Sequence, residues 1–186
     1  MHLSISDASG DSAIFEYIDG KLVIHHGKQY QVMTNSPTYD QQLSLAAYWQ
    51  NIGGSTMLPG TNRASDRFVR MSYYINETTQ TADPRRAVAT VFSVMRNVSV
   101  PIGIKIPGQP NIADTLWLTV SDQKNKVYYY QDTNSPSILW VRLNHLNFNE
   151  GSGPRRLQLD GNPDVGGDQT RNFKPAALFK FLAPHD

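Results

Sequence analysis

The chain contains no cysteine among its 186 residues. Disulfide bonds, thiolate metal sites and cysteine nucleophiles supplied by this chain are therefore excluded. The absence leaves the compartment open, because cytoplasmic and periplasmic proteins can both lack cysteine.

The chain also lacks a long apolar run and a strong charge of either sign. No segment approaches the ~18 apolar residues of a membrane span, and the N-terminal residues lack the basic and apolar regions of a signal peptide. The formal net charge of +1 gives no basic footprint for nucleic acid or an anionic membrane. We therefore expect neither nucleic acid nor a membrane as a partner.

The first third of the chain has strand patterns. Residues 13–18 and 21–25 flank Asp19-Gly20, a dipeptide that favours a two-residue hairpin because both turn residues need positive φ. Residues 30–34 are predicted as a further strand, so three or four antiparallel strands are expected. The alternation of residues 3–7 begins directly behind Met1, which indicates a start inside a longer fold.

Three helices are predicted in the middle of the chain. The first covers residues 41–52 and is broken by Gly53-Gly54, and the third has Asp83 as its N-cap and Pro84 at its first helical position. Their apolar faces are, in chain order, Leu45, Tyr48, Trp49 and Ile52; Ala64, Phe68, Met71 and Ile75; and Val88, Val91, Phe92 and Met95.

The last third returns to strands. Residues 115–120 and 126–131 flank a polar hairpin loop, and residues 137–143 form one more strand. Residues 149–175 are assigned as a long irregular loop, and residues 176–182 as a terminal strand or a short helix. Strands, then helices, then strands predict a single α+β domain over residues 1–186, with helices packed on antiparallel sheets.

Two motifs carry the functional signal. Thr34-Asn35-Ser36-Pro37 leads into Thr38-Tyr39-Asp40-Gln41-Gln42, and by local chemistry alone Asn35 is a turn residue. Leu58-Pro59-Gly60 is followed by Ser65-Asp66-Arg67-Phe68-Val69-Arg70. Helical arginines commonly form a solvated face, but Arg67 lies beside the buried stripe of its helix.

Together these motifs resemble the choloylglycine hydrolase family, which includes penicillin V acylases and bile salt hydrolases. The resemblance runs from about Leu3 to Phe148. It implies the αββα sandwich of N-terminal nucleophile hydrolases, hydrolysis of a small-molecule linear amide, and no cofactor. By this resemblance Asn35 is an oxyanion-hole donor, and Arg67 approaches the nucleophile and favours its thiolate form.

The family's N-terminal cysteine, which is nucleophile and base, cannot be mapped onto this sequence. We interpret the chain as the C-terminal portion of an amidohydrolase that is inactive alone, and we expect a missing N-terminal half or self-association to cover its sheets. Penicillin V, conjugated bile acids and N-acyl homoserine lactones are the expected substrate classes. The alternative is a cysteine-less, non-catalytic relative that acts in binding or assembly.

No metal site is predicted. Residues 160–164 are similar to the start of a calcium loop, but Val165 and Arg171 stand where that loop needs glycine and glutamate. His25 and His26 point to opposite faces of a strand and cannot easily share a metal ion.

Overall fold

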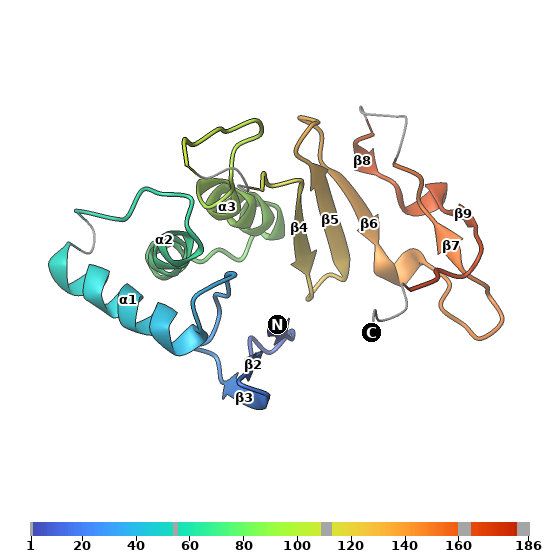
Figure 1. Ribbon diagram of the computed structural model, residues 1–186. Helices are drawn as coiled ribbons and strands as arrows, with labels where there is room; N and C mark the ends of the chain where they lie inside the picture. The colour runs from blue at the N-terminus through green and yellow to red at the C-terminus, as the bar shows by residue number, and fades with distance from the viewer. Residues whose placement is uncertain (1, 54–55, 109–112, 160–164, 182–186) are drawn as a thin grey trace. The chain divides into compact units, whose positions relative to one another are not determined.

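The structure is a computed structural model that describes residues 2–53, 56–108, 113–159 and 165–181 (Figure 1). The chain divides into two compact units, residues 1–115 and 116–186. The first unit has a three-stranded sheet and, in its described residues, three α-helices, whereas the second consists of short strands and 3-10 turns. The α+β class is confirmed, and the single domain over residues 1–186 stays a prediction.

The first unit opens with an antiparallel sheet in the order β1-β2-β3. β1 covers His2–Ser6, β2 covers Ser12–Ile18 and β3 covers Lys21–His26. Asp19 and Gly20 connect β2 to β3 with φ angles of 48° and 76°, the two positive values that a type I′ hairpin requires. The predicted hairpin is confirmed.

Three α-helices follow the sheet: α1 Tyr39–Ile52, α2 Ala64–Glu77 and α3 Pro84–Asn97. α1 packs on α2, and α2 packs on α3. The Asp83 carboxylate accepts a hydrogen bond from the Arg85 N–H at 2.9 Å, and Pro84 takes the first helical position, where its missing N–H costs nothing. The start predicted for the third helix is confirmed.

The core of the first unit joins β2, residues 30–34, α1 and α2. Its buried apolar members are Ile14, Val32, Tyr39 and Phe68. The Tyr39 and Phe68 rings meet edge to face with their centroids 5.7 Å apart. Burial raises the pKa of Tyr39 to about 12, and Tyr30 and Glu16 add to the effect. The first turn of α1 therefore sits in the centre of this core.

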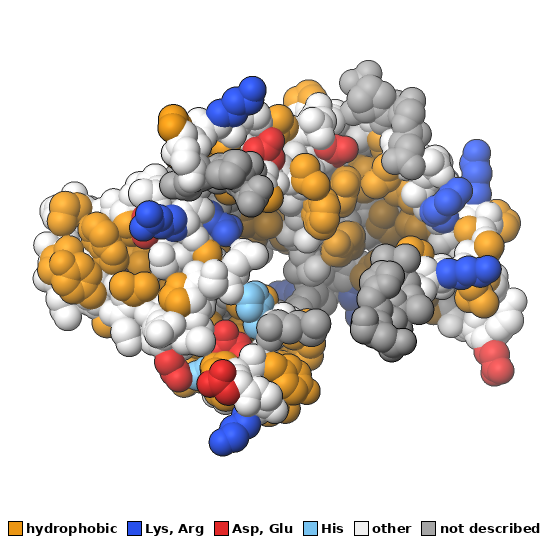
Figure 2. All heavy atoms as spheres, viewed as in Figure 1, with side chains coloured by type: hydrophobic (Ala, Val, Ile, Leu, Met, Phe, Trp, Pro, Cys, Tyr) orange, Lys and Arg blue, Asp and Glu red, His pale blue; other side chains and the backbone are white. Residues whose placement is uncertain are grey.

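The apolar stripe predicted for α1 is wrong as a core face. Tyr48 is 57% exposed, and Leu45 and Ile52 are exposed as well. Hydrophobic side chains gather over this helix at the left of Figure 2. The buried residues of α1 are Tyr39 and Gln42, because only the beginning of the helix packs against the core.

One face of the β1-β2-β3 sheet is apolar and uncovered within the first unit. The cross-strand pairs Leu3↔Phe15 and Phe15↔Ile24 place these side chains on one face, while Ile14 points to the buried core on the other. Leu3, Ile5, Tyr17, Leu22 and Ile24 are all exposed. A second apolar layer would be needed to bury this face.

The strand predicted at residues 30–34 is wrong, and so is the terminal strand or short helix predicted at residues 176–182 in the part that the structure describes. Residues 30–34 and 176–181 have no regular secondary structure, and Leu182 lies outside the described residues. The alternation in residues 30–34 reflects packing of an extended segment, because Val32 and Thr34 are buried while the Tyr30 carbonyl accepts from Ser12 Oγ at 2.6 Å instead of joining a ladder. In the tail, Leu178, Phe179 and Phe181 are exposed and make no strand pairing.

The second unit is built on β4 Trp117–Asp122, β5 Val127–Asp132 and β6 Leu139–Arg142. These three strands are antiparallel, as predicted, but β8 Gly167–Asp168 pairs with β6 in parallel. The prediction of purely antiparallel sheets is therefore wrong for this sheet. A parallel neighbour requires a long connection, and residues 143–166 supply it.

The segment predicted as an irregular loop contains further short elements. They are β7 Arg155–Arg156 paired with β9 Lys174–Pro175, and the 3-10 turn η2 Thr170–Asn172; another 3-10 turn, η1, covers Leu143–His145. Asp168 anchors β8, because it accepts from Thr170 and from Arg142 Nε at 2.9 Å. The Thr170 bonds and then Arg142 lower the pKa of Asp168 to about 2.

We expect Phe68→Ala to lower the free energy of unfolding of the first unit by about 3–5 kcal/mol, because it opens a cavity in a packed core. Phe148→Ala is the matched control, since Phe148 is 73% exposed and its removal should cost less than about 0.5 kcal/mol. Chemical denaturation followed by circular dichroism measures both. Equal effects of the two substitutions would contradict the described core.

Candidate functional site

The structure brings the two predicted site residues into contact. Asn35 lies in the turn before α1 and is exposed, and Arg67 lies in the first turn of α2 and is partly buried. Arg67 Nη2 donates to Asn35 Oδ1 at 3.2 Å across 32 positions of sequence. A shared site for the two is geometrically possible, and their catalytic roles stay predictions.

The guanidinium fixes how the Asn35 amide is oriented. Arginine has only donors, so Asn35 must turn its oxygen toward Arg67 and its NH₂ group away from it. Among the residues that the structure describes, no acceptor contacts Asn35 Nδ2. That NH₂ group is free to donate to an oxygen that carries negative charge.

Arg67 and Arg70 hold the segment that precedes α2. Arg67 Nε donates to the Asn62 carbonyl at 3.2 Å, and Arg70 Nη1 donates to the carbonyls of Pro59 and Thr61 at 2.7 and 2.8 Å. The two arginines thus bind backbone carbonyls of residues 59–62, which connect the Leu58-Pro59-Gly60 part of the second motif to α2.

The charge of Arg67 is not neutralised locally. Burial and then the nearby Arg70 lower the pKa of Arg67, yet a guanidinium remains protonated at any physiological pH. Within the described ranges, no carboxylate lies within ion-pair distance of Arg67. The site therefore presents a fixed positive charge beside an oriented amide.

Buried hydrogen bonds support the turn that carries Asn35. Thr34 Oγ1 donates to Gln42 Oε1 and contacts the Ala64 carbonyl at 2.9 Å, and Gln42 Nε2 donates to the Pro37 carbonyl at 2.7 Å. Gln42 is only 1% exposed. The sequence analysis placed Gln42 in the first motif but gave it no role, because its partners become visible only in three dimensions.

The start of α1 is fixed by a buried carboxylate. Glu16 of β2 is 6% exposed, and its Oε2 accepts the Tyr39 N–H at 2.9 Å. A negative charge is favourable at the positive end of a helix, where N–H groups lack partners within the helix. Glu16 thereby fixes the direction in which the chain leaves the Asn35 turn.

The two neighbouring histidines do not form a metal site. His25 packs against Tyr30 and Tyr39, with ring centroids 5.5 and 4.8 Å apart, while His26 Nε2 lies 2.9 Å from Asp11 Oδ2. The described part of the chain has no cluster of three residues that could hold a metal ion. The calcium-loop segment 160–164 lies outside the described residues.

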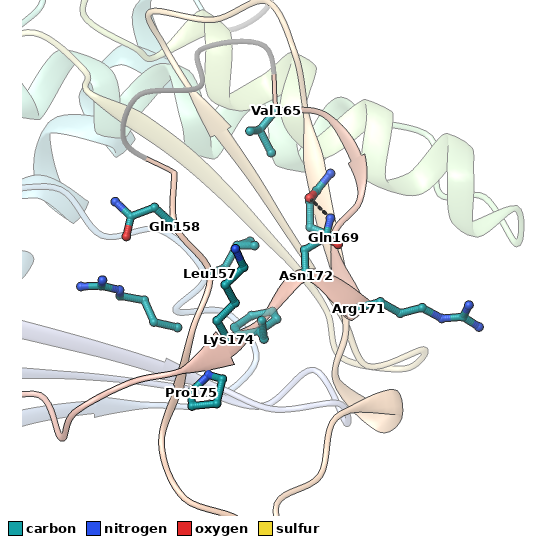
Figure 3. Close-up of a pocket in the computed structure, with 10 residues that line it drawn as sticks. Leu157, Gln158, Val165, Gln169, Arg171, Asn172, Lys174 and Pro175 are labelled. Atoms are coloured by element: carbon teal, nitrogen blue, oxygen red, sulfur yellow. Dashed lines mark hydrogen bonds between the residues drawn. The ribbon is translucent and has the colours of Figure 1, made fainter.

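A pocket in the C-terminal unit carries no predicted site residue. It has a volume of about 610 Å³ and its lining includes Arg156, Arg171 and Lys174. Figure 3 shows the Arg171 side chain directed away from the other labelled residues, and Asn172 Nδ2 donating to Gln169 Oε1 at 2.6 Å. The three cations are all exposed, so this pocket is a solvated surface hollow.

A smaller pocket of about 390 Å³ lies between α1 and α2. Its lining includes Gln50, Val69, Tyr73 and Glu77, and neither Asn35 nor Arg67.

In the part of the chain that the structure describes, none of the helices has the length and apolar character needed to span a bilayer.

The sequence and the fold match known linear amide hydrolases. Residues 1–155 match the family described as linear amide C-N hydrolases, choloylglycine hydrolase family. The chain is 50% identical to a penicillin V acylase of Pectobacterium atrosepticum, covering 97% of this chain and 52% of that protein. These matches define the class: the chain belongs to the choloylglycine hydrolase family.

Solved structures agree with this assignment. The penicillin V acylase of Agrobacterium tumefaciens is 54% identical and superposes with a TM-score of 0.90, covering 98% of this chain and 59% of that one. A mutant of the conjugated bile acid hydrolase of Clostridium perfringens shares the fold at 20% identity with a TM-score of 0.65, covering 100% of this chain and 56% of that one. Within the family the chain is thus a penicillin V acylase homologue, and it spans about half the length of these relatives.

Proposed function

We propose that this chain supplies the oxyanion-binding and thiolate-stabilising part of a penicillin V acylase-type active site. The hydrogen bond from Arg67 to Asn35 Oδ1 is the observation that carries the proposal, because it joins the two residues and leaves the amide donor free. The nucleophilic cysteine comes from residues outside this sequence, which contains none.

Asn35 acts on the oxygen of the scissile amide. When a thiolate attacks the carbonyl carbon, the C=O π electrons move to the oxygen and a tetrahedral oxyanion forms. The Asn35 NH₂ donates to that oxygen, and a donor of this kind lowers the barrier by about 3–4 kcal/mol. The C–N bond then breaks, the amine leaves with a proton, and water hydrolyses the acyl-enzyme.

Arg67 acts on the nucleophile and on Asn35. A positive charge near a thiol favours the thiolate and lowers the thiol pKa. The same guanidinium holds the amide oxygen of Asn35 at 3.2 Å, which keeps the NH₂ group turned outward. Arg67 thus acts both on the thiol nucleophile and on the Asn35 amide that binds the oxyanion.

We further propose that the chain is the C-terminal portion of one αββα sandwich domain. The uncovered apolar face of Leu3, Ile5, Tyr17, Leu22 and Ile24 supports a second sheet packed against β1-β2-β3, because sheets bury apolar faces against each other. The missing N-terminal half or self-association would supply the remaining cover. The length of the relatives, about twice that of this chain, supports the same proposal.

The substrate of the complete enzyme would be a small linear amide. Two relatives that share half or more of their aligned residues with this chain are both penicillin V acylases. These two relatives support penicillin V, rather than conjugated bile acids or N-acyl homoserine lactones, as the proposed substrate class of the complete enzyme. No cofactor is required by this chemistry, since thiolate attack and amide donation involve only protein groups.

A non-catalytic binding or assembly protein is the second candidate. The observation that favours it is the absence of cysteine from the sequence. Such a protein would retain the Asn35–Arg67 pair as a recognition site for an amide or acyl group without turnover.

We expect the purified 186-residue chain to leave penicillin V and conjugated bile salts intact, because it has no cysteine nucleophile. Release of the amine product, followed by chromatography, measures this. Turnover that persists after mass spectrometry excludes a contaminating hydrolase would contradict the proposal. Tight ligand binding without turnover would favour the non-catalytic candidate.

In the enzyme that carries these residues together with its N-terminal cysteine, Asn35→Ala should lower kcat by about 10²–10³ with a smaller change in KM, because the bond strengthens in the transition state. Asn35→Asp keeps the shape but replaces the NH₂ group by a carboxylate oxygen, which repels the oxyanion and pairs with Arg67, so it should lower kcat at least as much. Asn51→Ala, at an exposed position of α1, is the control. Steady-state kinetics that show a change in KM alone would exclude the oxyanion role.

Arg67→Ala should move the acidic limb of the pH–rate profile to higher pH in the same enzyme. Removing the positive charge raises the thiol pKa, so the thiolate forms only at higher pH. Arg63→Ala serves as the control, because Arg63 is exposed and precedes the same helix. An unmoved acidic limb in kcat/KM would show that Arg67 does not act on the nucleophile.

A further inference from the structure

We propose that Gln42 is the positioning residue of this site: its buried side-chain amide binds the Thr34 hydroxyl on one side of Asn35 and the Pro37 backbone carbonyl on the other, and through Thr34 it fixes that turn against the start of α2. The inference rests on the proposed function for its catalytic meaning, and its structural part can be tested separately.

The oxygen and the NH₂ group of the Gln42 side chain bind residues on either side of Asn35. Gln42 Oε1 accepts from the hydroxyl of Thr34, the residue before Asn35, and Gln42 Nε2 donates to the carbonyl of Pro37, two residues after it. The turn that presents Asn35 is therefore bound at both sides by a single rigid plane. Rotation of the turn would break at least one of these bonds and leave a buried polar group without a partner.

Thr34 extends the connection to the helix that carries Arg67. Its single hydroxyl hydrogen is shared between Gln42 Oε1 and the carbonyl of Ala64, which lies 2.9 Å from Oγ1 and belongs to the first residue of α2. Arg67 follows within one turn of that helix and donates to Asn35. A closed path thus runs from Gln42 through Thr34 and α2 to Arg67 and back to the Asn35 amide.

The choice of an amide at this buried position is informative. Gln42 is among the largest fully buried side chains, together with Tyr39 and Phe68, and an apolar residue could fill the same space. Burying an amide is unfavourable unless its polar groups are hydrogen-bonded. Because the oxygen and the NH₂ group of the Gln42 amide are both hydrogen-bonded, they favour one orientation of the turn, which an apolar side chain could not do.

The structural test uses the full 186-residue chain. Gln42→Met keeps the size of the side chain and removes both bonds, and Gln50→Met, at an exposed position of the same helix, is the matched control. Amide and guanidinium NMR signals report on the Asn35 NH₂ group and on the Arg67 Nη–H group that donates to Asn35. We expect both to shift, and the Arg67 Nη–H to exchange several-fold faster with water, in Gln42→Met but not in Gln50→Met.

A second pair keeps the test decisive if Gln42→Met fails to fold. Thr34→Val removes the hydroxyl at nearly constant volume, whereas Thr34→Ser retains it. We expect Thr34→Val to shift the Asn35 and Arg67 signals and Thr34→Ser to keep them near those of the parent chain. Unchanged signals in the folded Gln42→Met and Thr34→Val variants would overturn the proposal, as would equal effects of Val and Ser at position 34.

The catalytic arm uses the enzyme that includes the N-terminal cysteine. There Gln42→Met should lower kcat by roughly ten- to a hundred-fold with KM nearly unchanged, because a displaced donor loses mostly transition-state stabilisation. Thr34→Ser should restore the activity that Thr34→Val loses. If the NMR signals shift while kcat stays constant, Gln42 positions the turn but the oxyanion role of Asn35 fails, so the two proposals are separated.

Discussion

The site in this chain depends on the burial of the first turn of α1. Tyr39 packs among His25, Tyr30 and Phe68, its backbone N–H binds the buried Glu16 carboxylate, and Gln42 lies in the same turn with both ends of its amide hydrogen-bonded. Apolar burial supplies the favourable free energy of this arrangement, while the buried polar groups select one orientation. These buried contacts restrain the orientation of the exposed turn that carries Asn35.

An asparagine in a turn and an arginine on a helix are ordinary surface features when they occur apart. Their combination here is different, because the guanidinium leaves the amide only one orientation and brings to the same place a positive charge that no carboxylate of the described residues pairs. An amide donor and a cation that are fixed before substrate arrives lose little energy to reorganisation during the reaction. The rest of the unit supports this pair, through α2, which carries Arg67, and through segment 59–62, which Arg67 and Arg70 hold.

Local signals predicted local structure well. Asp19-Gly20 and Asp83-Pro84 act through their own φ angles and caps, so the hairpin and the start of α3 could be read from sequence. The strand predicted at residues 30–34, the strand or short helix predicted at residues 176–182, and the burial of the apolar face of α1 all depend on neighbours that a period cannot specify. The same holds for the parallel pairing of β6 with β8.

The sequence by itself determined the lack of a cysteine nucleophile, because residue identity shows it directly. It also determined the family and the candidate residues Asn35 and Arg67, through the resemblance of its two motifs to that family. Only the tertiary structure decided that the two candidates touch, that the Asn35 amide turns its oxygen to Arg67, and that Gln42 supports the turn. These facts depend on the packing of α1 and α2 around a common core, which brings together residues 32 positions apart. Hydrogen-bond direction at a site is a property of that packing, and sequence spacing does not encode it.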